Sequence, residues 1–332
     1  MRLLLVNMKI AFVGKGGSGK TTLSSLFIRH LAAAGATVVA VDADINQHLG
    51  AALGLEEDEA AALPAMGDRL RLIKDYLRGR NPRIASADTM IKTTPPGEGS
   101  RLLRVAGGQP GVRRLRAPGG ARRRRRPPDG HRTVHGRRPG GRLLPLQDGS
   151  GGTLPQPSGG RPGRVRGGRH DGGSDSFASG MFTRFDMTFL VAEPTRKGVS
   201  VYRQYKEYAR DFGVALKVVG NKVHGQDDID FLRTEVGDDL LVTVGQSDWV
   251  RSMEKGRPPR FELLEDANRR SLRTLRAAAD AMYGVRDWQR YTRQMVHFHL
   301  KNAASWGNER TGADLAAQID PGFVLNEGLA AV

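Results

Sequence analysis

The 332-residue sequence predicts an α/β fold with a mostly parallel, doubly wound sheet and a helical C-terminal extension. Short apolar runs of strand length recur along the chain, and patterns of helix length follow them. A glycine-rich turn joins the first apolar run to the first predicted helix. Polar residues follow several later runs, at the strand ends where parallel sheets bind ligands. One internal segment, rich in Arg, Gly and Pro and predicted to be disordered, departs from this pattern.

The first predicted strand, residues 8–13, leads into a glycine-rich turn, and a helix is predicted over residues 22–34. The turn reads Gly14-Lys15-Gly16-Gly17-Ser18-Gly19-Lys20-Thr21-Thr22. Backbone N–H groups at such a turn converge on one spot, where the helix dipole also favours negative charge. Gly14, Gly19, Lys20 and Thr21 satisfy the P-loop pattern G-x-x-x-x-G-K-[ST]. We therefore expect a polyphosphate here, with Lys20 on the β- and γ-phosphates and the Thr21 hydroxyl on Mg²⁺. The alternative is a turn that merely connects strand and helix.

The first lysine of the turn indicates a more specific class. The run from Lys15 to Thr21 reads K-G-G-x-G-K-[ST], which resembles the variant P-loop of the MinD/ParA-type (SIMIBI class) ATPases. The resemblance implies ATP and Mg²⁺ as cofactors, held by Gly14 and by residues 16–22. It also implies that Lys15 crosses a homodimer and meets γ-phosphate charge on the partner's nucleotide. A solvated loop lysine is the alternative.

A second strand, predicted over residues 36–41, ends in Asp42-Ala43-Asp44. Carboxylates at such a strand end face the phosphate site. The family resemblance implies that Asp42 holds Mg²⁺ through water and that Asp44 orients the attacking water; a solvated turn is the alternative. Residues 46–50 and 53–54 resemble the accessory ATPases that insert nickel into carbon monoxide dehydrogenase. Ile45 stands where those proteins usually have proline.

The second half continues the same architecture. Strands are predicted over residues 187–192, 214–219 and 240–244, and helices over about 197–210 and 262–282. Gly220-Asn221-Lys222 follows the middle strand, where α/β sheets bind ligands. In MinD/ParA relatives an asparagine here hydrogen-bonds adenine, so the resemblance implies that role for Asn221; capping a turn is the alternative. His224 replaces the aspartate of a guanine-specific motif, which favours ATP.

Residues 105–173 have a different composition from the rest of the chain. They contain 16 Arg, no Lys and three acidic residues, and so carry +13 of the net charge of +17. They also hold 19 of the 43 Gly and 9 of the 17 Pro, but no Ile, Phe, Tyr, Trp or Met. Such a segment cannot build an apolar core.

Three interpretations of this segment remain open. It is a basic arm that binds nucleic acid, a solvated insertion without a role, or the product of a frameshift that enters near Val105 and is reversed near Gly173. We favour the frameshift, because codons read from the second base permit an apolar run V-V-V-D that would end where Arg169 stands. The strand beside the P-loop strand, with its Mg²⁺-linked aspartate, would then be missing from this chain.

The whole composition limits the classes of protein. No apolar run approaches membrane-spanning length, so no transmembrane segment is expected. The absence of Cys excludes disulfides and agrees with a cytoplasmic enzyme. In the tail, Trp288, Tyr291, Met295 and Phe298 recur at helical spacing, which predicts an amphipathic helix packed on the core; membrane-surface binding is the alternative.

These observations predict four parts. They are the first half of the ATPase domain (1–104), the Arg/Gly/Pro-rich segment (105–173), the second half (174–284) and a tail (285–332). The predicted function is that of a Mg²⁺-dependent, homodimeric ATPase switch that acts on an unknown partner protein, with metalloenzyme maturation as one task. The alternatives are a partition-type ATPase that binds nucleic acid through the basic segment, and a defective product.

Overall fold

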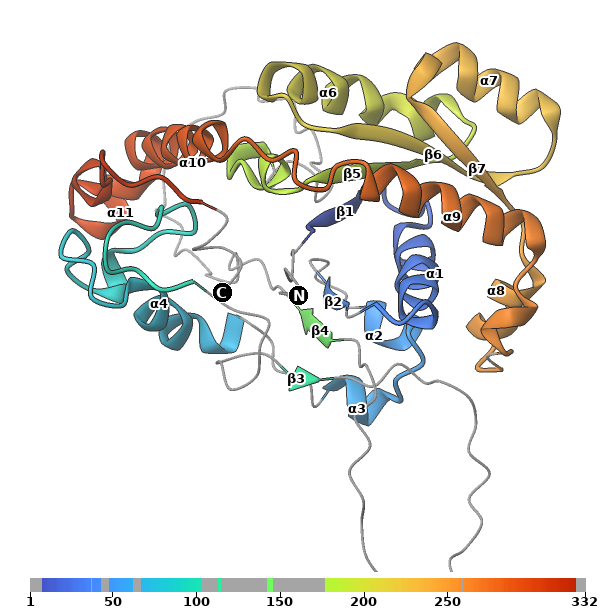
Figure 1. The fold of residues 1–332 in the computed structure, drawn as a ribbon, viewed down its shortest axis with the longest axis horizontal. Helices are drawn as coiled ribbons and strands as arrows, with labels where there is room; N and C mark the ends of the chain where they lie inside the picture. The colour runs from blue at the N-terminus through green and yellow to red at the C-terminus, as the bar shows by residue number, and fades with distance from the viewer. Residues whose placement is uncertain are drawn as a thin grey trace, which may run out of the picture.

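The computed structural model describes residues 8–36, 38–42, 48–61, 67–102, 113–114, 142–145, 177–257 and 259–326. Its main sheet has four parallel strands in the order β1-β5-β6-β7 (Figure 1). They are β1 (Ile10–Val13), β5 (Met187–Ala192), β6 (Leu216–Val223) and β7 (Leu240–Gly245). Because the strands are parallel, the turn after β1 and the last residues of β6 lie at the same edge of the sheet.

Helices cover both faces of this sheet, as the predicted doubly wound fold requires. Phe189 and Val191 of β5 pack on one face with α1 and α9, and Leu190 and Ala192 pack on the other with α6 and α7 (Figure 1). All six residues of β5 are buried, which explains its continuous apolar sequence. The helices are α1 (Lys20–Ala33), α6 (Arg196–Phe212), α7 (Gln226–Val236), α8 (Asp248–Glu254) and α9 (Asp266–Asp280).

The parallel sheet is interrupted beside the P-loop strand. β2 (Val39–Asp42) does not join the main sheet; it pairs with β4 (Arg142–Pro145), which pairs antiparallel with β3 (Arg113–Arg114). In the part of the chain that the structure describes, β1 pairs only with β5. The sheet is therefore divided where the sequence predicts that an inner strand is missing.

The Arg/Gly/Pro-rich segment contains more regular structure than its composition predicts. Two short strands, β3 and β4, lie within residues 105–173. Leu143 and Leu144 pair with Ala40 and Val41 of β2, which offers an open strand edge. The remainder of the segment lies outside the described residues.

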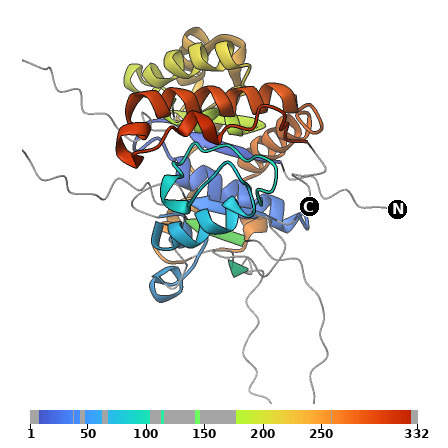
Figure 2. The same cartoon turned by 90° about the vertical axis from the view of Figure 1, so that its left-hand side faces the viewer.

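The tail packs against the rest of the protein, as its apolar stripe predicts. Met295 and Phe298 are buried, and Phe298 joins the core on the α6 face of the sheet. Figures 1 and 2 both place the tail beside residues 84–102. Further elements include α2 (Leu49–Ala52), α3 (Glu57–Ala61), α4 (Leu70–Arg78), α10 (Trp288–Asn302), the π-helical turn Ala303–Gly307, α11 (Asn308–Thr311) and the 3₁₀ turn Leu315–Gln318.

Several boundaries differ from those predicted. The second strand begins at Val39, and α9 is shorter at both ends than the predicted helix because a separate 3₁₀ turn, Phe261–Leu263, precedes it. The third strand of the main sheet continues to Val223, past its predicted end. The helix after β5 does end before Gly213, whose φ of 59° gives the left-handed C-cap that glycine favours.

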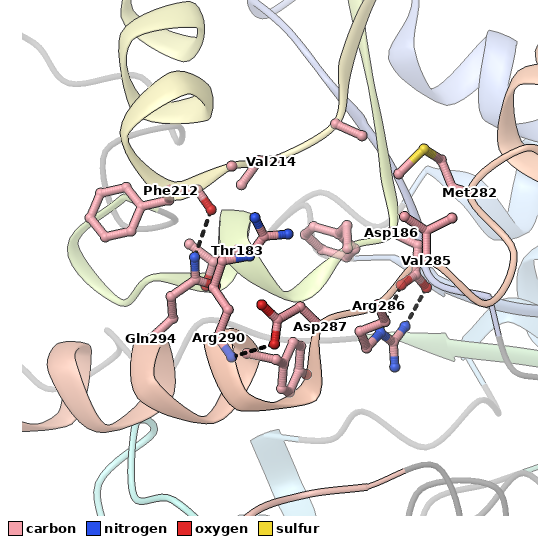
Figure 3. Close-up of a pocket in the computed structure, with 14 residues that line it drawn as sticks. Thr183, Asp186, Phe212, Val214, Met282, Val285, Arg286, Asp287, Arg290 and Gln294 are labelled. Carbon is pink, nitrogen blue, oxygen red and sulfur yellow. Dashed lines mark hydrogen bonds and ion pairs between the residues drawn. The ribbon is translucent and has the colours of Figure 1, made fainter.

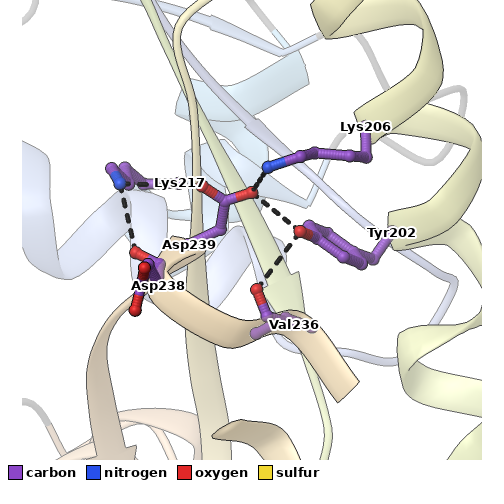
Figure 4. A network of polar contacts seen from close by, with 6 residues as sticks. All are labelled: Tyr202, Lys206, Lys217, Val236, Asp238 and Asp239. Carbon is purple, nitrogen blue, oxygen red and sulfur yellow. Dashed lines mark hydrogen bonds and ion pairs between the residues drawn. The ribbon is translucent and has the colours of Figure 1, made fainter. Parts of the chain in front are cut away.

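An ionic cluster fastens α6 to the opposite edge of the sheet (Figure 4). Asp239 accepts a hydrogen bond from the Tyr202 hydroxyl at 2.7 Å and contacts the ammonium groups of Lys206 and Lys217. Burial opposes ionisation of Asp239, but the hydrogen bonds from Lys206 and Tyr202 prevail and hold its pKa below the ordinary value. The cluster joins α6 to β6 and to the turn Gly237–Asp239, which leads into β7.

Candidate nucleotide-binding site

The glycine-rich turn occupies the position that the P-loop pattern requires. It leaves β1 after Val13 and enters α1 at Lys20, with Gly19 as the residue before the helix. Gly16 and Gly17 are exposed, whereas Ser18 is buried. The first backbone N–H groups of α1 have no partners within the helix, so they are available to an anion at this end.

Two glycines of the turn are required by close contacts. Gly14 has φ of 147°, and a Cβ atom there would lie 2.3 Å from the carbonyl oxygen of Val191. Gly19 has φ of 90°, and a Cβ atom there would lie 2.2 Å from Nδ2 of Asn221. Any larger residue would collide with a neighbouring strand, and both conformations favour glycine. The turn is therefore pressed against β5 and β6.

The carbonyl oxygen of Lys15 organises the inside of the loop. It accepts hydrogen bonds from the backbone N–H of Ser18 at 3.1 Å and from Nζ of Lys20 at 3.0 Å. The Lys20 ammonium is thus folded over its own loop, where phosphate oxygens would compete for it. The hydroxyl of Ser18, which is 2% exposed, has no hydrogen-bond partner among the described residues. A buried hydroxyl without a partner is costly, and a phosphate oxygen would satisfy it.

Two residues of β6 hold the loop from the other side. Asn221 donates a hydrogen bond from Nδ2 to the carbonyl oxygen of Ser18 at 2.8 Å. Lys222 donates from Nζ to the carbonyl oxygen of Gly17 at 2.8 Å and pairs with the Glu193 carboxylate at the end of β5. Asn221 lies at the sheet edge where strand ends bind ligands, and its predicted contact with adenine stays a prediction. No role was predicted for Lys222 or Glu193.

Lys222 also has an unusual backbone conformation. Its φ of 59° is the only positive value at a non-glycine residue in the described ranges, and the pairing of β6 with β7 shifts register around it. Non-glycine residues in this region carry strain of about 1 kcal/mol or more. This backbone conformation turns Nζ of Lys222 toward the P-loop. There Nζ contacts the carbonyl oxygen of Gly17 and the carboxylate of Glu193.

The predicted carboxylates are only partly described. Asp42 ends β2, is 9% exposed and accepts a hydrogen bond at Oδ2 from the backbone N–H of Leu49 at 2.9 Å. It therefore holds the start of α2, on a strand that does not belong to the sheet of the P-loop. Asp44, predicted to orient the attacking water, lies outside the described residues.

The oxygen donors present fit Mg²⁺ in type. A hydroxyl at Thr21, in the first turn of α1, and a carboxylate at Asp42 are the hard ligands that Mg²⁺ prefers, with water completing its shell. Within the described ranges, no three His, Cys, Asp or Glu side chains are grouped closely enough to hold a metal ion by themselves. A Mg²⁺ ion here would thus depend on the bound phosphates for its remaining ligands.

Comparison with known protein families decides the class. The model of the CobQ/CobB/MinD/ParA nucleotide binding domain matches residues 10–259, which is most of the chain. The chain belongs to this family. The predicted MinD/ParA-type P-loop ATPase and its α/β fold are confirmed by this membership, and the matched range covers both the P-loop and Asn221.

Two known proteins are similar in sequence to parts of the chain. Over 56 residues, 17% of the chain, it is 43% identical to the carbon monoxide dehydrogenase accessory protein CooC of Rhodospirillum rubrum, of which the match spans 21%. Over 249 residues, 70% of the chain, it is 26% identical to an uncharacterised ATP-binding protein of Methanocaldococcus jannaschii, of which the match spans 83%. The chain therefore aligns with about a fifth of CooC.

Two solved structures with bound nucleotide are similar to the chain. A plasmid partition protein from Borrelia burgdorferi B31, bound to AMPPNP, has a TM-score of 0.44 and 10% identity; 83% of this chain and all of that chain are covered. A variant of McdA from Cyanothece in complex with ATP has a TM-score of 0.46 and 14% identity, with 82% and 96% covered. Among the described residues, no helix has the length and apolar character needed to cross a membrane.

Proposed function

We propose that the protein is a Mg²⁺-dependent ATPase that dimerises around ATP and uses hydrolysis as a switch on a partner protein. The observation that carries this proposal is the P-loop itself, fixed between β1 and α1 and fastened to Asn221 by the hydrogen bond to Ser18. A loop held in this way already has its conformation before ATP arrives. Little conformational entropy of the loop is therefore lost when ATP binds.

Asn221 supports ATP as the nucleotide. Its Nδ2 is used on the P-loop, which leaves the side-chain oxygen Oδ1 as an acceptor. The exocyclic amino group of adenine is a donor, whereas guanine offers a carbonyl oxygen at the corresponding position. Asp228, one of the two acids in the first turn of α7, accepts a hydrogen bond from the backbone N–H of His224. We therefore infer that the base site selects adenine.

In the proposed reaction, water attacks the γ-phosphorus in line with the departing ADP, which leaves as its β–γ bridging oxygen takes up the negative charge. Lys20 and the N–H groups of the loop stabilise the charge on the β- and γ-phosphates. Lys15, supplied by the second copy, adds positive charge as the transition state forms, and Asp44 orients the water. Mg²⁺, when bound, neutralises the same phosphate oxygens.

The match to CooC supports a metalloenzyme as the partner. The relative is named as an accessory protein of carbon monoxide dehydrogenase, and the aligned portion is short. We infer that this protein serves the maturation of a metalloenzyme, with the nucleotide cycle driving its attachment and release.

Turnover by two lysine variants tests the proposal. Lys20→Ala should lose both ATP binding and hydrolysis, because it removes the charge inside the loop. Lys15→Ala should keep binding but lose hydrolysis, because its charge acts on the partner's nucleotide. Lys301→Ala, at an exposed position of α10, is the matched control. Retained turnover in both loop variants would contradict the proposal.

A second candidate rests on the interrupted sheet. β1 is the edge strand of its sheet in the described part of the chain, although it carries the P-loop, and β2 pairs elsewhere. This favours a chain that binds ATP but lacks the inner strand and its aspartate, and therefore does not hydrolyse ATP. Turnover by the wild-type polypeptide, absent in Lys20→Ala, would exclude this candidate; binding without turnover would support it.

A further inference from the structure

The C-terminal extension is fastened at its start by a buried ion pair (Figure 3). The guanidinium of Arg286 meets both carboxylate oxygens of Asp186; Nε lies 2.7 Å from Oδ1, and Nη2 contacts Oδ2. The two side chains are only 15% and 10% exposed. Asp186 also accepts a hydrogen bond from the backbone N–H of Lys9 at 2.7 Å. Such a bidentate pair fixes direction as well as distance, so α10 leaves the sheet at a defined angle.

From this anchor, α10 reaches the turn formed by residues 177–184, which lies directly before β5. The Phe298 ring covers Gly180, where an added Cβ atom would lie 2.3 Å from the ring. Asn302, which is 5% exposed, donates a hydrogen bond from Nδ2 to the carbonyl oxygen of Ala178 at 3.0 Å. Its Oδ1 accepts one from the indole of Trp306 at 2.9 Å. The tail thus holds the turn through Phe298, through Asn302 and through Tyr291, whose carbonyl oxygen accepts a hydrogen bond from Arg184 at 3.3 Å.

The end of the extension holds a second segment, residues 84–101. Gln318, which is 4% exposed, donates from Nε2 to the carbonyl oxygen of Thr89 at 2.9 Å and accepts from the Thr94 hydroxyl at 3.1 Å. Asp320 accepts from the backbone N–H of Glu98 at 2.9 Å. Leu315 is fully buried against Ile91. These contacts join positions more than 200 residues apart.

The two segments that the tail holds flank the chain between residues 102 and 177. We propose that residues 286–325 form a clasp that positions the turn 177–184, with Phe298 and Asn302 as its positioning residues. The consequence for hydrolysis rests on the proposed function, whereas the holding of the turn does not.

The position of this turn matters for the P-loop because β5 connects the two. β5 begins three residues after Arg184 and ends beside the loop, where the Val191 carbonyl presses on Gly14 and Glu193 pairs with Lys222. On its other side the turn is held by Phe177, whose ring stacks on Tyr208. The tail side combines the contact of the Phe298 ring with Phe182 and two hydrogen bonds, from Asn302 to the carbonyl oxygen of Ala178 and from Arg184 to the carbonyl oxygen of Tyr291.

The clasp is tested in the full-length protein with two independent variants. Asn302→Ala removes the donor to Ala178, and Gly180→Ala brings a methyl group against the Phe298 ring. Leu300→Ala, at a 42% exposed position of the same helix, is the control. Backbone hydrogen exchange is followed in residues 177–184 and, as an internal reference, in α7, with and without ATP and Mg²⁺. ATP affinity and turnover are measured on the same preparations.

Both clasp variants should exchange roughly tenfold faster in residues 177–184, with no change in α7 and wild-type values in Leu300→Ala. ATP affinity should stay unchanged while kcat falls severalfold at constant KM, because the variants do not touch the nucleotide. Unchanged exchange in the turn, or faster exchange spread equally to α7, would overturn the clasp. Faster exchange with unchanged kcat would overturn its positioning role. Absence of turnover in the wild type counts against the proposed function alone, because exchange without ATP still decides whether the tail holds the turn.

Discussion

The side-chain amide of Asn221 donates to the carbonyl oxygen of Ser18 across 2.8 Å, and so ties the end of β6 to the glycine-rich loop after β1. The two residues are 203 positions apart in the sequence. One side chain thereby supports the phosphate loop and presents its other end, Oδ1, to the base. The phosphate and base halves of the proposed ATP site are thus set in register by a single residue.

Replacing Asn221 by Ala should weaken ATP binding about tenfold, because one partly buried hydrogen bond and one proposed base contact are lost together. Gln226→Ala, at an exposed position just beyond the strand, is the matched control. The affinity for ATP, measured by competition with a fluorescent analogue, decides the matter. Equal affinities in the two variants would show that Asn221 has no part in the site.

The Gly19→Ala variant should lose ATP binding almost completely. The added methyl group would lie 2.2 Å from Nδ2 of Asn221, and the φ of 90° disfavours any side chain. Gly225→Ala is a suitable control, because nothing lies within 4 Å of a Cβ atom there. Thermal melting should change little in the control, and ATP should raise the melting temperature of the control but not of Gly19→Ala. An equal rise in both would contradict the close contact.

Docking of the tail should weaken as the pH falls below about 6.5. His299 is fully buried and lies 2.8 Å from the carbonyl oxygen of Leu315, so the assigned tautomer carries its proton on Nε2. Burial lowers the pKa of this imidazole. As the pH falls, His299 in the unfolded chain therefore takes up a proton before His299 in the folded protein does. The contribution of His299 to the free energy of unfolding is complete above its pKa in the unfolded chain. It is lost as the pH falls toward its lower pKa in the folded protein.

The measurement is the melting temperature at pH 7.5 and 5.5 in the wild type, in His299→Gln and in His297→Gln. His297 is exposed on the same helix, so its variant should keep the pH dependence of the wild type. His299→Gln should show a smaller loss between the two pH values. A loss in His299→Gln as large as that in the wild type would place the titrating group elsewhere.

Restoring the reading frame between Val105 and Gly173 should stabilise the protein. A strand supplied between β1 and β2 would pair both open edges and join the two sheets into one. We expect the melting temperature to rise by roughly 5–15 °C, because several kcal/mol of pairing and burial are added. Resequencing the gene across these codons is the companion measurement. An equal or lower melting temperature would argue that the Arg-rich segment is genuine.

The sequence predicted the P-loop, β5 and α6 well because each has a complete local signal. β5 is a continuous apolar run bounded by Asp186 and Glu193-Pro194, and α6 ends at a glycine that adopts the left-handed conformation. The residues of β6 predicted its end less well, because the strand continues to Val223. The polar pair Asn221-Lys222 resembles a strand end, but the backbone pairs onward with β7 because P-loop carbonyls satisfy both side chains.

The rest could not be predicted because it depends on contacts between distant residues. The stripe of Met295 and Phe298 indicated that α10 packs on the core, but not that Gln318 binds Thr89 or that Asn302 binds Ala178. Nothing local to Lys222 indicates its pairing with Glu193 and Gly17. Asp44 lies outside the described residues, so its predicted role stays a prediction.

The central claim, that this chain holds ATP in the loop after β1, is tested most directly by calorimetric titration of ATP with Mg²⁺ into the wild-type protein and into Lys20→Ala. We predict saturable binding of one ATP per chain in the wild type, and none in the variant, because the Lys20 ammonium lies inside the loop where the phosphates would bind. Equal heats in the two proteins, whether both bind or neither does, would contradict the account.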